Sequence, residues 1–290
     1  MSKRDYSLLF DGSGARKEVG ILLLHGLGGT PLELKVVARG LAARGFTVSC
    51  PQLAGHCGTE QELLATGWAD WFASAECALT DLEQRCHTVI VGGLSIGAVL
   101  ALRLAALHPD RVDGMTLFAP TLWYDGFAMP WYGFLLRLAF TTTRVDHLRF
   151  AERAPYGIKD ENIRSVVSSA LISGKSSEVG LTCTPLGAMR EAHRLVRDVK
   201  RRVPAIKTPT LLIHPREDDI SDLSNAHWLQ RRLGGLVECV VLDDSYHIIT
   251  VDRQRGVVVE RTADFIAFVE RHRVSHETQP VHTAPMLAAE

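Results

Sequence analysis

The chain of 290 residues has 46% hydrophobic and 22% charged residues and a formal net charge of −1. This composition is typical of a globular protein with one large core, and the near-neutral charge gives no electrostatic reason to expect binding to nucleic acid or to an anionic membrane. The N-terminal stretch MSKRDYSLLFDGSG lacks the apolar run of a signal peptide, and no apolar stretch is long enough for stable membrane insertion. We therefore expect a cytoplasmic protein whose partner is a small molecule.

Short apolar runs alternate with helical patterns along the chain. The runs VGILLLHG, FTVSCPQ, HTVIVGG, DGMTLFAP, TPTLLIHP and LVECVVLDD have the nearly continuous, β-branched hydrophobicity of strands that are covered on both faces. A helix that ends at Gly45 is predicted after the first run. Its start is indicated by Thr30 as N-cap, by Pro31 at the first helical position and by Glu33 as the last residue of a capping box. Further helices are predicted over 68–85, 95–109, 223–233 and 261–271. This alternation predicts an α/β fold, with a mostly parallel sheet flanked by helices.

The alternation breaks between Pro120 and Thr208, where roughly ninety residues separate two predicted strands. That gap is too long for a simple crossover. We therefore predict a mostly helical lid or cap, residues 121–204, inserted into a core made of residues 1–120 and 205–272. Residues 273–290 show no periodicity and few large apolar side chains, and we expect this tail to be disordered.

The stretch GLSIG, residues 93–97, places a serine between two glycines where a predicted strand becomes a helix. Such a sharp turn forces Ser95 into an unfavourable backbone conformation, and glycine at positions 93 and 97 relieves the crowding. The Ser95 hydroxyl would then stand clear of the sheet, near helix N-terminal amides that favour negative charge. The motif in this context predicts that Ser95 is a nucleophile, although a closely packed turn of small residues would have the same pattern.

A serine nucleophile needs a histidine to take its proton and a carboxylate to orient that histidine. On this architecture the acid follows the serine in the chain and the histidine comes last. His247 follows the last clear strand-like run, which favours it over His25 and His56, two other histidines in loops at strand ends.

The acid lies after the strand TLLIHP, where Asp218 and Asp219 are adjacent, Glu217 precedes them and Asp222 is close. Neighbouring side chains at a strand end point in different directions, so we expect one of these acids to reach the histidine.

An acyl-transfer site also needs two donors for an oxyanion, and these are usually backbone amides. One is expected to be the amide of Ile96, directly after the nucleophile. The other is expected from the turn HGLGG, which can bring the amide of Leu27 close to the same point. An ordinary glycine-rich turn is the alternative for this segment.

Taken together, LLLHGLGGTP, PQLAGH, GLSIG, LLIHPRED and SYHIITVD resemble the α/β-hydrolase superfamily, most of all its small bacterial carboxylesterases and monoacylglycerol-lipase-like members. The resemblance covers about residues 18–120 and 205–270. It implies Ser95 as nucleophile, Asp218 as acid and His247 as base, with the same two oxyanion amides and a lid over the site. Asp218 is preferred over Asp219 because the family's acid is commonly followed, two positions later, by an aliphatic residue, here Ile220. The chain departs from the family in reading GHC for GHG and in having Tyr246 where glycine often precedes the histidine.

The start of the insertion, TLWYDGFAMPWYGFLLRLAF, is rich in aromatic side chains that would suit the inner face of a lid over an acyl pocket. Ordinary packing of the lid on the core explains the same pattern equally well, and attachment to a lipid surface explains it less well. The side chains that we expect to contact substrate are His25, Trp123, Phe127 and Trp131.

The sequence as a whole predicts a serine hydrolase that cleaves carboxylic esters through an acyl-enzyme, with no metal and no organic cofactor. The same triad can serve a thioesterase or acyltransferase acting on carrier-bound acyl groups, or a C–C bond hydrolase. The basic helix REAHRLVRDVKRR would suit an acidic carrier, although a solvated charged face is its default interpretation. A ligand-binding protein with an idle triad is the non-enzymatic alternative. The sequence does not fix the oligomeric state.

Overall fold

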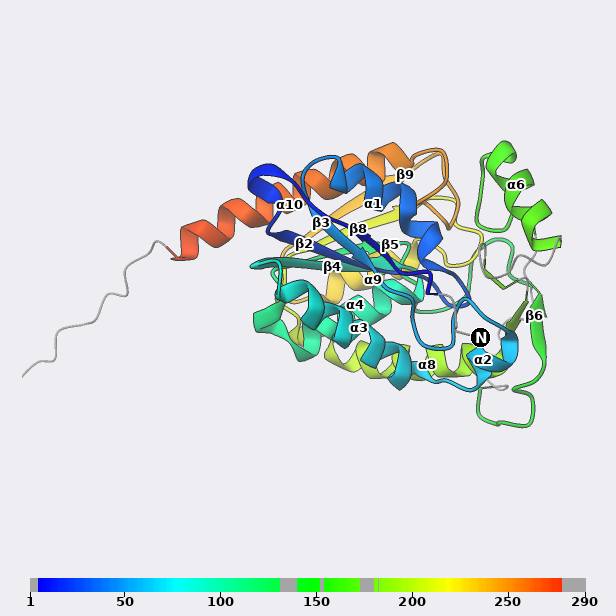
Figure 1. The fold of residues 1–290 in the computed structure, drawn as a ribbon. Helices are drawn as coiled ribbons and strands as arrows, with labels where there is room; N and C mark the ends of the chain where they lie inside the picture. The colour runs from blue at the N-terminus through cyan, green and yellow to red at the C-terminus, as the bar shows by residue number, and fades with distance from the viewer. Residues whose placement is uncertain (1–4, 131–139, 152–153, 173–179, 182, 278–290) are drawn as a thin grey trace, which may run out of the picture.

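A computed structural model describes residues 5–130, 140–151, 154–172, 180–181 and 183–277 (Figure 1). Its centre is a seven-stranded sheet in the order β1-β3-β2-β4-β5-β8-β9. β1 is antiparallel to β3 and the other neighbours are parallel, so the predicted mostly parallel sheet is confirmed. The strands are β1 (Leu8–Phe10), β2 (Val19–Leu24), β3 (Thr47–Cys50), β4 (Thr88–Leu94), β5 (Gly114–Phe118), β8 (Thr210–Pro215) and β9 (Val237–Leu242).

Helices cover both faces of this sheet (Figure 1). One face carries α3 (Trp68–Glu83), α4 (Ile96–Leu107), α8 (Leu186–Arg202) and α9 (Ser224–Arg232), and the other carries α1 (Lys35–Ala42) and α10 (Arg255–Glu277). Each face has its own buried apolar cluster. Every residue of β2 and β4 is buried, which is why these strands read as continuous apolar runs rather than alternating ones.

The helix boundaries differ from the sequence prediction: α1 ends at Ala42 rather than at Gly45, and α10 begins at Arg255 rather than at 261. The helix expected after Thr30 begins as a 3-10 turn, η2 (Pro31–Leu34), and continues as α1; the Thr30 hydroxyl accepts a hydrogen bond from the amide of Leu32, as expected of an N-cap. α10 extends to Glu277, five residues into the tail that the sequence analysis expects to be disordered, and the rest of that tail lies outside the described residues.

The insertion at 121–204 is more mixed than the mostly helical lid that was predicted. β6 (Arg149–Ala151) and β7 (Cys183–Pro185) form a small antiparallel sheet, and α6 (Glu161–Ile172) stands beside it, away from the large sheet (Figure 1). α8 also belongs to this stretch, yet it packs on α4 and α3 as part of the helical layer of the core. The short elements are α2 (Glu60–Leu64), η1 (Gly14–Arg16), η3 (Pro109–Arg111) and η5 (Val203–Ala205).

Among the helices of the described residues, none combines the length and the apolar character that crossing a membrane would require.

Candidate active site

Ser95 lies in the sharp turn between β4 and α4, with φ 57° and ψ −116°. The two flanking glycines are required by space: a Cβ at Gly93 would come within 2.4 Å of the carbonyl oxygen of Leu24, and one at Gly97 within 2.0 Å of the same atom. The amide of Ser95 donates to the carbonyl of Phe118 on β5 at 2.9 Å. The strain at Ser95 is therefore imposed by close backbone packing, as the sequence motif predicts.

His247 and Asp218 meet at the carboxyl ends of β9 and β8. The imidazole Nδ1 lies 2.8 Å from Asp218 Oδ2 and 3.0 Å from Oδ1. Burial alone would favour the neutral form of each group, but their mutual attraction prevails, so that the pKa of Asp218 is lowered and that of His247 is raised. Asp218 Oδ1 also accepts from the amides of Ile220 and Ser221, both at 2.8 Å. With Nδ1 held as a donor to Asp218, Nε2 of the neutral imidazole is left as the proton acceptor.

The neighbouring acids have other partners. Asp219 is buried and accepts from the amide of Gly157 at 2.8 Å and from the amide of His247 at 3.3 Å, while burial raises its pKa. Glu217 pairs with Lys159, and Asp222 accepts from the amide of Ser224 at the start of α9. Among these four acids, Asp218 is the one whose side chain contacts the imidazole.

Two hydroxyl groups that the sequence analysis did not single out connect Ser95 to this pair. Ser95 Oγ lies 3.0 Å from Thr121 Oγ1, and Thr121 donates to Ser221 Oγ at 3.1 Å or to the carbonyl of Ala119 at 3.4 Å. Either hydroxyl can donate the shared bond, and Ser95 is the donor whenever Thr121 gives its one proton to Ser221 or to Ala119. Ser221 Oγ lies 3.5 Å from His247 Nδ1. Ser95 is thus bonded to Thr121 in this structure, and it has to turn toward His247 before it can pass on its proton.

The glycine-rich loop after β2, residues 26–30, lies beside Ser95 and includes Leu27, one of the two predicted oxyanion donors. The other, Ile96, is the first residue of α4. His25 is fully buried: its Nδ1 bonds to the carbonyl of Gly26 at 3.0 Å and its Nε2 accepts from the amide of Leu53 at 3.2 Å. Burial and the neighbouring His56 lower the pKa of His25 to about 3. His25 therefore supports the loop and does not line the described pocket, so its contact with substrate stays a prediction.

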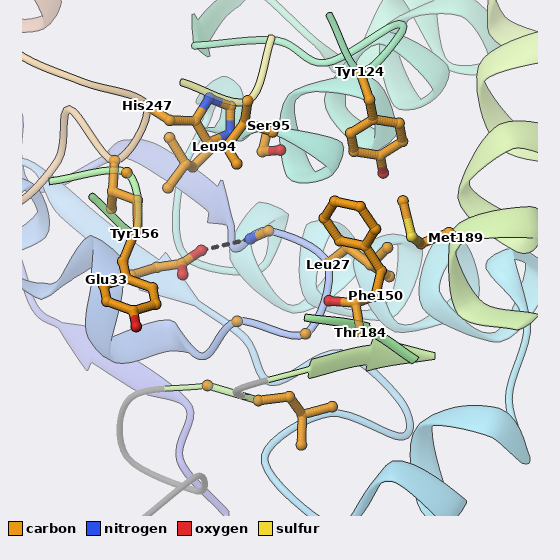
Figure 2. A pocket seen from close by; sticks show the side chains of 18 of the residues that line it. Leu27, Glu33, Leu94, Ser95, Tyr124, Phe150, Tyr156, Thr184, Met189 and His247 are labelled. Carbon is orange, nitrogen blue, oxygen red and sulfur yellow. Dashed lines mark hydrogen bonds between the residues drawn. The ribbon is translucent and has the colours of Figure 1, made fainter. Parts of the chain in front are cut away.

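Glu33 is a third residue whose place in the site the sequence analysis missed. Its carboxylate Oε1 accepts from the amide of Gly26 at 2.5 Å, and the side chain lines the pocket beside Ser95 and His247 (Figure 2). Burial raises the pKa of Glu33 to about 7. The T-x-x-E pattern was visible in the sequence, but it indicated only a helix cap.

A pocket opens over Ser95 and His247 (Figure 2). Its apolar lining includes Leu27, Tyr124, Phe150 and Met189, which lie together in Figure 2, away from Glu33 and Tyr156. Tyr124, Met129, Phe150 and Tyr156 come from the insertion, so the insertion forms part of the pocket wall.

The aromatic side chains expected to contact substrate lie elsewhere or are not described. Trp123 packs on Trp228 and bonds through Nε1 to Asp125, and Phe127 is 58% exposed against the ring of Tyr246. Neither lines the pocket in the described part of the chain. Trp131 lies outside the described residues. Tyr124 and Met129 of this segment line the pocket, but the aromatic composition alone could not say which side chains face inward.

Comparison with known proteins now identifies the family. The family described as serine aminopeptidase, S33 (Hydrolase_4), matches residues 15–254. The chain belongs to this family. It is 29% identical over 250 residues to the thermostable monoacylglycerol lipase of Bacillus sp. (strain H-257), covering 86% of this chain and 90% of that protein. It is 24% identical to the carboxylesterase of Bacillus subtilis (strain 168), covering 85% and 91% of the two chains.

A solved structure from work on two metagenome-derived lipolytic enzymes, LipS and LipT, aligns with a TM-score of 0.77 at 26% identity. The alignment covers 92% of this chain and 97% of that chain. These findings confirm the α/β-hydrolase fold of this S33 family member, and they confirm the predicted enzyme class, a serine ester hydrolase.

Proposed function

We propose that this enzyme hydrolyses small carboxylic esters with an apolar acyl group, with Ser95 as nucleophile, His247 as general base and Asp218 as the acid that orients it. The observation that carries the proposal is the contact of 2.8 Å between His247 Nδ1 and Asp218 Oδ2, formed next to a serine in a strained strand-to-helix turn. This is the constellation that nucleophilic acyl transfer requires.

In the first half of the reaction, Ser95 turns from Thr121 to His247 Nε2 and attacks the ester carbonyl carbon as Nε2 takes its proton. The amides of Leu27 and Ile96 bind the oxyanion. The imidazolium, stabilised by Asp218, then gives its proton to the leaving alkoxide, and an acyl-enzyme remains. In the second half, water gives a proton to His247 Nε2 and attacks the acyl-enzyme, which releases the acid and restores the Ser95 hydroxyl.

The pocket wall supports an apolar acyl group as substrate. Leu27, Tyr124, Phe150 and Met189 offer aliphatic and aromatic surface close to Ser95. Monoacylglycerols fit this description, as do simple esters of medium-chain acids, and the two relatives named above carry names of these two kinds. We also propose that the part of the insertion beside the pocket, with β6, β7 and α6, acts as its cap.

The pocket wall, rather than the charge of α8, supports a small-molecule ester. Arg190 pairs with Asp146, but Arg201 and Arg202 share the single carboxylate of Asp198 with Arg103, so α8 keeps a net basic charge. The apolar side chains beside Ser95 suit a free acyl ester, and we propose such an ester as the preferred substrate.

The decisive experiment is hydrolysis of p-nitrophenyl esters with acyl chains from two to sixteen carbons, with Ser95→Ala as control, alongside labelling by a fluorophosphonate. We expect turnover and labelling that both depend on Ser95, with a chain-length optimum that reports the depth of the pocket. Activity that persists in Ser95→Ala would refute the assignment. Labelling without turnover of any of these esters would refute the proposed substrate class, and a lack of both would favour a binding protein.

A further inference from the structure

Glu33 links the oxyanion loop to the start of η2. Oε1 accepts from the amide of Gly26 at 2.5 Å, and the amide of Thr30 also interacts with the carboxylate. These two amides lie at opposite ends of the loop 26–30, and Leu27 lies between them. A carboxylate that binds both ends of a loop restricts the movement of the residues between them.

The carboxylate fits closely against the loop. A Cβ at Gly29 would come within 2.4 Å of Glu33 Oε2, and one at Gly26 would lie 3.4 Å from Oε1 and 3.6 Å from Cβ of Ser95. Gly29 therefore leaves the space that the carboxylate fills, whereas a Cβ at Gly26 would make ordinary contacts. The same contacts place the carboxylate near Ser95, among the side chains that line the pocket (Figure 2).

Charge connects Glu33 to the catalytic histidine as well. The imidazole of His247 acts electrostatically on Glu33, and Glu33 in turn raises the pKa of His247. Asp218 and Asp219 act on His247 in the same direction from the loop after β8, while His214 lies beyond Asp218, 3.4 Å from its Oδ2. Three carboxylates thus surround one imidazole, and Glu33 is the one that also contacts the oxyanion loop.

We propose that Glu33 is a positioning residue of this esterase site: it holds the loop 26–30 in the conformation that aims the Leu27 amide at the oxyanion, and its charge stabilises the imidazolium form of His247. This inference rests on the proposed roles of Ser95, His247 and Leu27. It gives Glu33 two separable effects, one through hydrogen bonds and one through charge.

Three variants separate the effects. Glu33→Gln removes the charge and replaces one acceptor oxygen by a donor. Glu33→Asp keeps the charge but is one methylene too short to reach Gly26 from the same backbone. Glu62→Gln is the matched control, because Glu62 also binds a backbone amide at the start of a helix, that of Thr59 at 2.7 Å, and does not line the described pocket.

The first measurement uses kcat and KM for p-nitrophenyl butyrate. We expect kcat to fall at least about tenfold in both Glu33 variants, because each loses a hydrogen bond to a charged group that positions the oxyanion loop in the transition state. We expect KM to stay within about twofold of the wild type, because substrate binding does not depend on that bond. Glu62→Gln is expected to keep the wild-type kcat. An unchanged kcat in both Glu33 variants, in an enzyme whose turnover depends on Ser95, would overturn the positioning role.

The second measurement needs no substrate: it is the pKa of the His247 imidazole, followed by NMR with histidine-selective labelling. We expect a lower pKa in Glu33→Gln than in wild type, and a value close to wild type in Glu33→Asp and Glu62→Gln. Equal pKa values in wild type and Glu33→Gln would overturn the electrostatic role. Because this titration does not depend on turnover, it tests Glu33 even if the ester assays fail and the proposed function is wrong.

Discussion

The buried carboxyl of Glu33 should make the free energy of unfolding depend on pH in a definite direction. Its pKa is 4.5 in an ordinary setting and about 7 in the folded protein, because burial disfavours the charged form. Between these two values the folded chain keeps a proton that the unfolded chain has already released, so stability falls as the pH rises through this window and levels off above it. At about 1.4 kcal/mol per pKa unit, the full loss is about 3 kcal/mol, an upper value because the side chain is partly open to the pocket.

Urea unfolding at pH 5 and pH 8 tests this reasoning. Glu33→Gln has no carboxyl to ionise, so it should not show this loss. From pH 5 to pH 8 its free energy of unfolding should therefore rise by about 2 to 3 kcal/mol relative to that of the wild type. Loss of one of the two acceptor oxygens that bind the amides of Gly26 and Thr30 adds an offset that is nearly independent of pH. Other titrating groups are common to both proteins and largely cancel, and Glu62→Gln should follow the wild type. Parallel curves for Glu33→Gln and wild type would refute the conclusion that the folded protein keeps this carboxyl protonated up to about pH 7, above which it ionises and its charge acts on His247.

Three further substitutions test other parts of the site. Asp218→Asn should lower kcat on the order of 10⁴-fold, since the histidine loses the carboxylate that fixes its tautomer, whereas Asp219→Asn should cost less than about tenfold; the reverse order in the ester assay would move the acid to Asp219. Thr121→Val should speed fluorophosphonate labelling by about two- to tenfold, because it removes the hydroxyl that competes with His247 for the hydroxyl of Ser95. Thr116→Val is its control, because it alters a buried pair of hydroxyls formed by Thr116 on β5 and Thr262 on α10; slower labelling in Thr121→Val alone would contradict the argument. Gly97→Ala should prevent folding, as judged by circular dichroism, because its Cβ would lie 2.0 Å from a backbone oxygen; a folded variant would show that the elbow can relax.

The parts of the fold that follow from local patterns were predictable from the sequence. β2 and β4 are buried on both faces, and their continuous apolar runs predicted such strands. The sharp turn at Ser95 requires glycines, and the sequence shows them directly. The order of serine, acid and histidine then follows from the topology, since the strands that precede them end at one edge of the sheet.

The insertion was less predictable because some of its residues form the wall of the pocket and others pack on the core. α8 has the amphipathic pattern of any surface helix, and nothing in that pattern tells whether the apolar face meets a cap or the core. In the same way, Trp123 and Phe127 were predicted to face the pocket because they are aromatic, whereas Tyr124, between them in the chain, is the one that does. Periodicity tells which residues share a face, and burial against a particular neighbour is decided by tertiary structure.

Glu33 shows why a local rule can name the right residue and miss its role. A glutamate three residues after an N-cap threonine is normally a helix-capping device, and its carboxylate is then exposed and stabilising. Here it is turned inward to Gly26, seven residues earlier, where burial raises its pKa and lowers the stability of the fold. A helix start can be capped in water without that loss, so capping alone does not account for a glutamate in this position. From its buried position the Glu33 carboxylate can bind the oxyanion loop and stabilise the imidazolium of His247, which an exposed capping glutamate cannot do. The loss of folding stability is the expected consequence of burying it there.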